Sequence, residues 1–190
     1  MQGGVFDMKV IAGEFKGRFI DMPEGIKPTS NKAREALFEI LKTRIAGASF
    51  LDIYSGSGAI GIEALSRGAK SAAFIDNNFK CVSVLKKNLT HLGISGLSSI
   101  NIYNKDVLAA LKTLSAARLS FDIVFLDPPY SMDTAKNTLI AISNYDILAR
   151  DVIIVAETYK KEKLPDDIGA LKKYRIALYG DTKLEFFSYE

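Results

Sequence analysis

From Ser49 onward, short apolar segments alternate with longer segments that have the apolar spacing of helices. The short segments predict strands at Ser49–Ile53, Ser71–Ile75, Ile100–Tyr103, Phe121–Leu126 and Val152–Ala156. The longer segments predict helices at Ala59–Arg67, Phe79–Leu92, Val107–Ser115 and Thr134–Ser143. Because a helical crossover leaves the strands on either side of it parallel, this order predicts an α/β fold with a Rossmann-like, doubly wound, mostly parallel sheet.

The C-terminal end departs from this alternation. Two strand-like segments, Lys173–Tyr179 and Lys183–Tyr189, are separated by a short turn that contains Gly180-Asp181. This spacing predicts an antiparallel hairpin and no further strand–helix–strand unit. One strand of the hairpin must therefore run antiparallel to the rest of the sheet.

The N-terminal end departs from it as well. Lys9–Ala12 and Arg18–Ile20 predict a small β-hairpin whose loop has a glycine at each end. The segment Met22–Ser30 contains two prolines and predicts a loop. Ser30 or Asn31 can cap the helix that follows, whose apolar stripe is Ala33, Leu37, Ile40 and Leu41.

Composition narrows the class of protein. The chain has 190 residues, 48% of them hydrophobic, and a net charge of +3, which suits one globular domain and permits an anionic partner without requiring one. The single cysteine and the single histidine predict neither an internal disulfide nor a metal site. Without a transmembrane run or a signal-peptide pattern, we expect a cytoplasmic protein, and a monomer by default.

A glycine-rich loop follows the first strand of the predicted sheet. Gly56, Gly58 and Gly61 have the spacing G-x-G-x-x-G, and Asp76 lies 20 residues beyond Gly56. This pattern is typical of dinucleotide-binding folds, in which the acidic residue binds a ribose. Asp52, however, stands at the end of the strand, where its charge would repel a pyrophosphate and attract a cationic ligand. The loop therefore favours S-adenosylmethionine, which carries a sulfonium and an ammonium group, over a nicotinamide dinucleotide.

Further polar residues follow the second and third strands of the predicted sheet. Asp76 could accept hydrogen bonds from both ribose hydroxyls, and Asp106 could accept one from an adenine amine. Either aspartate could alternatively cap the helix that follows it. The predicted cofactor-binding residues are Asp52, Ser55, Gly56, Gly58, Asp76, Asn77, Asp106 and Val107.

The tetrapeptide Asp127-Pro128-Pro129-Tyr130 ends the fourth strand. Proline has no N–H for a sheet ladder, so the strand must stop here, at the edge where open α/β sheets bind ligands. Methyl transfer to a nucleobase amine requires two acceptors that aim the nitrogen lone pair at the methyl group. The Asp127 carboxylate and the Pro128 carbonyl could be these acceptors, while Tyr130 stacks on the base. We therefore predict Asp127, Pro128, Pro129 and Tyr130 as the catalytic residues; a simple strand-ending turn is the alternative.

Several segments resemble one bacterial enzyme family along nearly the whole chain from Met8. The glycine loop, Asp76 and Asp127–Tyr130 resemble the class I S-adenosylmethionine-dependent methyltransferases that act on amines. The run Pro28–Phe38 is similar to the small-subunit rRNA guanine-N2 methyltransferases. The same holds for Ile11-Ala12-Gly13, Lys16-Gly17-Arg18, Gly61–Ala69 and Tyr179-Gly180-Asp181-Thr182. Lys27 departs from the family, which has arginine there, so a bidentate phosphate contact is lost at this position.

The resemblance implies an enzyme that methylates the N2 amine of one guanine in 16S rRNA, within an assembled or partly assembled small subunit. It assigns the basic N-terminal segment to the RNA, with Lys16, Arg18, Lys27, Thr29 and Arg34 as predicted RNA-binding residues. Residues 1–30 would then be a tail, hairpin and substrate-side loop, and residues 31–190 the methyltransferase domain with its leading helix. The alternatives are a methyltransferase acting on DNA adenine N6 or a protein amide, a nicotinamide oxidoreductase, and a non-enzymatic RNA-binding assembly factor.

Overall fold

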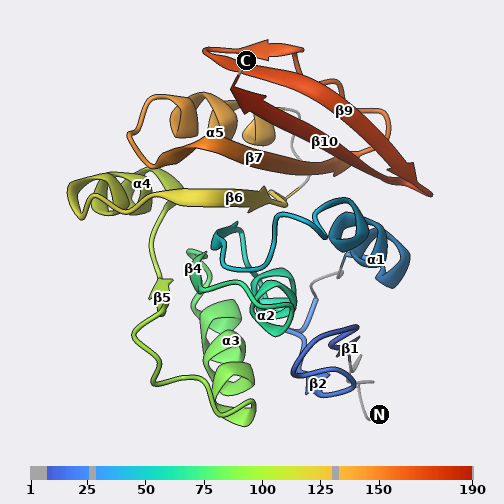
Figure 1. The fold of residues 1–190 in the computed structure, drawn as a ribbon, viewed down its shortest axis with the longest axis vertical. Helices are drawn as coiled ribbons and strands as arrows, with labels where there is room; N and C mark the ends of the chain where they lie inside the picture. Colours follow the sequence, from blue (N-terminus) through green and yellow to red (C-terminus); the bar gives the residue numbers. More distant parts are fainter. Residues whose placement is uncertain (1–7, 26–28, 130–132, 190) are drawn as a thin grey trace.

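The computed structural model describes residues 8–25, 29–129 and 133–189. Within them, an eight-stranded sheet has the order β5-β4-β3-β6-β7-β10-β9-β8 (Figure 1). Its strands are β3 (Ser49–Ile53), β4 (Ser71–Ile75), β5 (Ile100–Tyr103), β6 (Phe121–Leu126), β7 (Leu148–Tyr159), β8 (Asp167–Ile168), β9 (Leu171–Tyr179) and β10 (Thr182–Tyr189). Strands β3 to β7 are parallel, whereas β10 is antiparallel to both β7 and β9. The predicted fold class is confirmed, including the antiparallel C-terminal hairpin.

Five helices connect or precede the strands of the described chain: α1 (Asn31–Ile40), α2 (Ala59–Ser66), α3 (Phe79–His91), α4 (Val107–Ala116) and α5 (Thr134–Ser143). In this part of the chain no helix is long and apolar enough to span a membrane. All five were predicted, with their ends placed to within one residue where the helix follows a strand.

Strand parity decides which helices cover which face of the sheet. Phe50, Phe125 and Val155 pack in one buried cluster with Leu37 and Phe38 of α1. Their neighbours in sequence point the other way, and that face packs against α4 and α5, with Leu51, Val124, Ile154, Leu111 and Leu139 in the same cluster. Side chains alternate between the two faces of a strand. Asp52, Asp127 and Glu157 each follow the first set by two residues, so they belong to the α1 face at the end of their strands.

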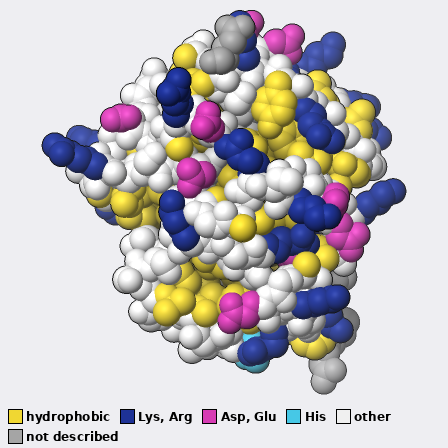
Figure 2. Space-filling view, in the orientation of Figure 1, with side chains coloured by type: hydrophobic (Ala, Val, Ile, Leu, Met, Phe, Trp, Pro, Cys, Tyr) yellow, Lys and Arg dark blue, Asp and Glu magenta, His cyan; other side chains and the backbone are white. Residues whose placement is uncertain are grey.

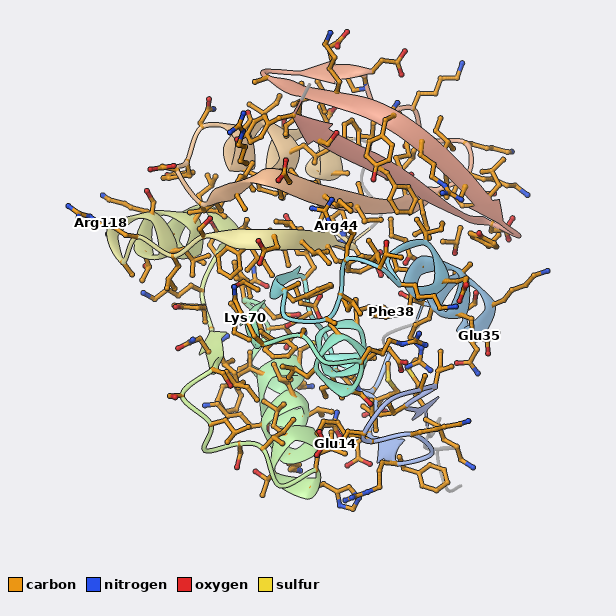
Figure 3. All side chains as sticks on the ribbon, viewed as in Figure 1. Glu14, Glu35, Phe38, Arg44, Lys70 and Arg118 are labelled. Carbon is orange, nitrogen blue, oxygen red and sulfur yellow. The ribbon has the colours of Figure 1, made fainter. Side chains whose placement is uncertain are left out.

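Helix α1 is held on the sheet by its own stripe and by its cap. The Ser30 hydroxyl accepts a hydrogen bond from the Ala33 amide, so Ser30 is the cap and Asn31 is the first helical residue. Phe38 is fully buried and points inward in Figure 3, whereas Glu35 is exposed. The predicted apolar stripe is confirmed: Ala33, Leu37 and Leu41 are fully buried, and Ile40 is partly buried against the same cluster as Leu37 and Leu41.

The N-terminal hairpin is docked on α2 by one buried glutamate. The Glu63 carboxylate accepts hydrogen bonds from the Ile11 amide (2.8 Å) and the Ala12 amide (3.0 Å), and it pairs with Arg67 (2.7 Å). Gly13 adopts φ +83°, and a side chain there would lie 1.7 Å from the Ser66 carbonyl oxygen, so only glycine permits this approach. The segments around Ile11 and Glu63, each of which resembles the same family in sequence, are therefore in direct contact in the structure.

The regular part of this hairpin is shorter than predicted. Strands β1 (Met8–Lys9) and β2 (Phe19–Ile20) have two residues each. Val10 still exchanges backbone hydrogen bonds with Arg18 and Gly17 beyond the strands. The chain then leaves the ladder because its next two amides bind Glu63.

Candidate active site

A small cavity of about 50 Å³ lies at the carboxyl end of the central strands, on the α1 face. The glycine loop and the end of β6 line it together with the N-terminal segment and α1; its residues include Asp52, Ser55, Gly56, Asp127, Thr29 and Arg34. Residues from all three predicted sets, for cofactor, catalysis and RNA, thus meet in one place. Open parallel sheets bind their ligands at this edge.

The glycine loop has the backbone geometry of a ligand cradle. Tyr54, Gly56 and Gly58 have φ angles of 64°, 54° and 79°, which turn the chain sharply between β3 and α2. A side chain on Gly56 would meet no atom within 4 Å, so this side of the loop is open. A side chain on Gly58 would lie 2.3 Å from Leu85, so this glycine is needed for packing instead.

Asp52 is buried and organises the loop from below. Its side chain is 1% exposed, and one carboxylate oxygen accepts a hydrogen bond of 2.9 Å from the Gly61 amide in α2. Burial raises the pKa of Asp52 to about 8, with a further contribution from the negative charge of Asp76 and an opposing one from the Gly61 amide. A nearby cationic ligand would reverse this shift and keep Asp52 ionised.

The other acids predicted for the cofactor site also have local partners. Asp76 accepts hydrogen bonds from the Gly56 amide (2.9 Å) and the Asn78 amide (2.8 Å), which fixes its carboxylate beside the open glycine. Asn78, not Asp76, caps α3. Asp106 caps α4 through the Leu108 amide (2.9 Å), as the alternative interpretation had it. The remaining residues predicted here lie nearby in the chain: Asn77 is exposed and Val107 is buried at the start of α4.

Two buried polar atoms at the cavity have no hydrogen-bond partner in the described residues: the Ser55 hydroxyl and Arg34 Nε. Unpaired buried polar groups are costly and usually await a ligand or water. Together with the Asp52 and Asp76 carboxylates, they offer donors and acceptors suited to the methionine and ribose parts of S-adenosylmethionine. The donor set therefore fits this cofactor.

Arg34 does not lie where a surface phosphate contact would need it. Its side chain is 1% exposed and donates hydrogen bonds to the Lys9 carbonyl (2.6 Å), to Asn31 (3.0 Å) and to the Met8 sulfur (2.7 Å). The guanidinium thus joins α1 to the N-terminal hairpin. The role of Arg34 in RNA binding stays a prediction; its burial was not predicted, since helical position alone does not distinguish a buried arginine from a solvated one.

Asp127 lies next to a second carboxylate that was not assigned a role from the sequence. Strands β6 and β7 pair Leu126 with Ala156, so Asp127 and Glu157 are the next residues of two neighbouring parallel strands. Burial, followed by the charges of Glu157 and Asp52, raises the pKa of Asp127 well above its ordinary value. Burial also raises the pKa of Glu157 to about 7. The signal for Glu157 was its place directly after the predicted strand Val152–Ala156, with the parity of Val155; in the structure β7 continues through it to Tyr159.

The predicted RNA-binding residues are dispersed. Lys16 is exposed, and Arg18 donates a hydrogen bond of 2.7 Å to the His91 carbonyl at the end of α3. Thr29 donates one of 3.0 Å to Glu157, which brings the substrate-side loop to the strand ends.

Of the predicted catalytic residues that follow Asp127, Pro128 is buried and Pro129 is exposed beyond β6. The predictions for Lys27 and Tyr130 fall outside the described residues.

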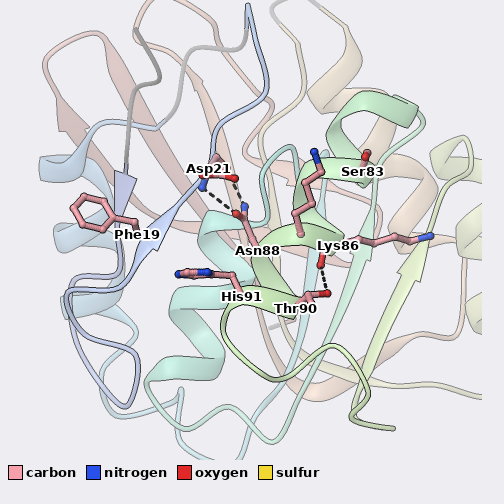
Figure 4. Close-up of a pocket in the computed structure, with 8 residues that line it drawn as sticks. Phe19, Asp21, Ser83, Lys86, Asn88, Thr90 and His91 are labelled. Carbon is pink, nitrogen blue, oxygen red and sulfur yellow. Dashed lines mark hydrogen bonds between the residues drawn. The ribbon is translucent and has the colours of Figure 1, made fainter.

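An open groove of about 810 Å³ separates the N-terminal hairpin from α3. Figure 4 shows Phe19 on the hairpin side of this groove, with its ring pointing away from Asn88 and His91 of α3; the other lining residues are Asp21, Ser83, Lys86, Lys87 and Thr90. Asn88 exchanges hydrogen bonds with the Asp21 backbone and also donates to the Ser57 carbonyl, so the groove wall is tied to the glycine loop. Figure 2 shows the histidine in cyan beside a dark-blue basic side chain at this end of the molecule.

Comparison with known proteins finds relatives that match nearly the whole length of the chain. A family model described as "Conserved hypothetical protein 95" matches residues 8–188. The chain is 35% identical to Bacillus subtilis YlbH, provisionally named an rRNA methyltransferase, with 95% of this chain and 98% of that protein covered. It is 32% identical to Ribosomal RNA small subunit methyltransferase D of Escherichia coli, with 98% and 92% covered.

A solved structure agrees. The structure of the Escherichia coli protein yhhF, provisionally titled a methyltransferase, superimposes with a TM-score of 0.84 at 29% identity and covers 97% of this chain and 98% of that one. The chain therefore belongs to the Conserved hypothetical protein 95 family, the small subunit methyltransferase D family of S-adenosylmethionine-dependent methyltransferases.

Proposed function

We propose that this protein transfers a methyl group from S-adenosylmethionine to the exocyclic N2 amine of one guanine in 16S rRNA of the small ribosomal subunit. The observation that carries the proposal is the position of Asp127, on the edge of the cavity that the glycine loop also lines. The names of its relatives support an rRNA substrate. The amine as acceptor is supported by the chemistry of the Asp127–Pro128 pair.

S-adenosylmethionine, when bound, supplies an electrophilic methyl group. Asp127 accepts one N–H of the guanine amine and the Pro128 carbonyl accepts the other, which turns the nitrogen lone pair towards that methyl group. The glycine loop with Asp52 and Asp76 would hold the cofactor, which would give its methyl group to this nitrogen and keep the electron pair of the broken carbon–sulfur bond. The nitrogen then carries a positive charge and releases one proton to the carboxylate beside it.

The groove between the hairpin and α3 is proposed as the path of the RNA. Phosphates are bound by lysine and arginine, and unpaired bases stack on exposed aromatic rings. Phe19 is 48% exposed with Lys9 4.6 Å from its ring centre, and Lys86 and Lys87 line the same groove. Residues 1–30 then act as the substrate-side segment and residues 31–190 as the methyltransferase domain.

Small subunits purified from cells that lack this activity test the proposal. Incubation with the protein and labelled S-adenosylmethionine should yield one N2-methylguanine in 16S rRNA, identified by mass spectrometry of nuclease fragments. Methylated adenine in DNA or a methylated protein amide would instead support the alternative methyltransferases. Cofactor binding without transfer to small subunits would contradict the rRNA substrate.

Replacing Lys86 and Lys87 together with serine should weaken binding to the small subunit by about tenfold at 0.1 M salt. The slope of log affinity against log salt should become shallower by about 2, since two phosphate contacts are lost. Fluorescence titrations across a salt series measure both. The matched control replaces Lys112 and Lys136, which are exposed on the helices of the opposite face. An equal loss in both double variants would contradict a specific groove.

A further inference from the structure

Glu157 stands at a junction of three segments beside the proposed reaction centre. One of its carboxylate oxygens accepts a hydrogen bond of 3.0 Å from the Thr29 hydroxyl, in the substrate-side segment. The other lies 3.5 Å from the Thr182 hydroxyl, at the start of β10. Its side chain is only 4% exposed, and Asp127 follows the neighbouring strand at the same level. Two segments that resembled the family, at Pro28–Phe38 and Tyr179–Thr182, thus meet on one carboxylate.

Among the described residues, neither carboxylate of this pair forms an ion pair with a lysine or an arginine. The lysines and arginines whose ion pairs are known there bind other acids. The titratable groups that line the cavity with Asp127 are Asp52, Tyr54 and Arg34. Two nitrogens of the Arg34 guanidinium bind the hairpin and Asn31, and its Nε has no partner in the described residues. Glu157 is buried and Asp127 is half-buried, and two adjacent carboxylates with so little access to water do not ionise together, so they hold one proton between them.

We propose that Glu157 is a positioning residue for methyl transfer, which shares one proton with Asp127 and whose two threonine hydroxyls determine where that proton lies. In the free protein, the hydroxyl donors favour the ionised form of Glu157, so the proton is on Asp127. When the guanine amine donates its N–H to Asp127, the proton moves to Glu157. This inference rests on the proposed function and extends it to a residue outside the Asp127–Tyr130 motif.

The proton and charge balance is complete. With the amine bound, Asp127 is ionised and Glu157 is protonated, so the pair has one negative charge next to the nitrogen that becomes positive. After transfer, the nitrogen gives one proton to Asp127, and the neutral pair later releases a proton to water. The negative charge of the pair therefore stabilises the positive charge that develops on the nitrogen in the transition state.

Glu157→Gln tests the shared proton because glutamine keeps the shape and one acceptor oxygen but removes the charge. The Asp127 carboxyl, followed by carbon-13 NMR, should then titrate about one pH unit lower than in the wild type. The acid limb of the pH profile of kcat/KM, which in the wild type reports the first ionisation of the pair, should in the variant coincide with the titration of Asp127 alone. An unmoved Asp127 titration would overturn the proposal, whatever the activity.

Thr29→Val is a second variant that leaves both carboxylates in place. Loss of its hydroxyl should raise the pKa of Glu157 and increase KM for small subunits more than it lowers kcat. Thr158→Val is the matched control, because this buried threonine on the next position of β7 binds Glu185 (3.3 Å) on the other face. Equal changes in the two valine variants would overturn the role of Thr29.

The stability of the protein provides a readout that needs no substrate. The pKa of Glu157 is raised from 4.5 to about 7, so the native state binds more protons than the unfolded state in this range. The free energy of unfolding must therefore fall as the pH rises through it. Glu157→Gln should flatten this fall. If the wild type does not methylate rRNA but the two carboxyl groups still titrate as a coupled pair, the proposed function is wrong and the proposal of a shared proton still holds.

Discussion

Replacing Asp127 with asparagine is expected to lower kcat for methyl transfer by about 10²–10³-fold. Asparagine still offers one acceptor oxygen, but it is neutral and cannot take the proton that the methylated amine releases. Affinity for S-adenosylmethionine should stay within about threefold, because the loss is confined to the transition state. Single-turnover methylation of small subunits and calorimetric titration with the cofactor measure the two effects separately.

The same strand supplies the control for this prediction. Asp122, at the opposite end of β6, accepts a hydrogen bond of 2.7 Å from the Ser49 amide and lies 3.6 Å from Lys70, which is labelled in Figure 3. Asp122→Asn removes a carboxylate of similar size far from the cavity and should leave kcat unchanged. If Asp127→Asn kept more than about a tenth of wild-type activity, Asp127 would not be the acceptor that aims the amine.

The parallel part of the sheet was predictable because its strands are continuous apolar runs. β3, β4, β5 and β6 have the predicted bounds. β7 begins at Leu148, four residues earlier than predicted. The prediction missed this part of the strand because it includes Arg150 and Asp151, which are exposed and have no strand pattern. β8 has two residues and was missed, since so short an edge strand exists only through its pairing with β9.

The site was predictable where a residue type was tied to a strand end, and less so where tertiary contacts decide. Asp52, Gly56 and Asp127 meet at one cavity because parallel strands share a carboxyl edge. The burial of Arg34 depends on a hairpin that lies more than ten residues away in the chain. The apolar pattern of the helix itself gives no information about this contact. Glu157 could have been found from its parity alone, but its threonine partners come from both ends of the chain.

Replacing Glu63 with alanine is expected to lower the free energy of unfolding by about 2–4 kcal/mol. The side chain is fully buried, and its loss leaves the Ile11 and Ala12 amides without their acceptor and Arg67 without its counterion. Arg67 is 18% exposed, so water recovers part of the lost interaction, which places the cost below that of a fully buried pair. Denaturant titration measures the global loss.

A second ion pair between residues one helical turn apart, at the spacing i,i+3, allows the effect of burial to be separated from that of charge. Glu39 pairs with Lys42 at 3.2 Å on the surface of α1, with side chains 70% and 68% exposed, so Glu39→Ala should change stability by less than about 0.5 kcal/mol. In Glu63→Ala, hydrogen exchange should accelerate first at Ile11 and Ala12, since the hairpin can leave α2 before the sheet unfolds. Binding of small subunits should weaken while cofactor binding persists, because the hairpin forms one wall of the proposed RNA groove. Unchanged exchange at these amides would show that the hairpin is held by its apolar contacts alone.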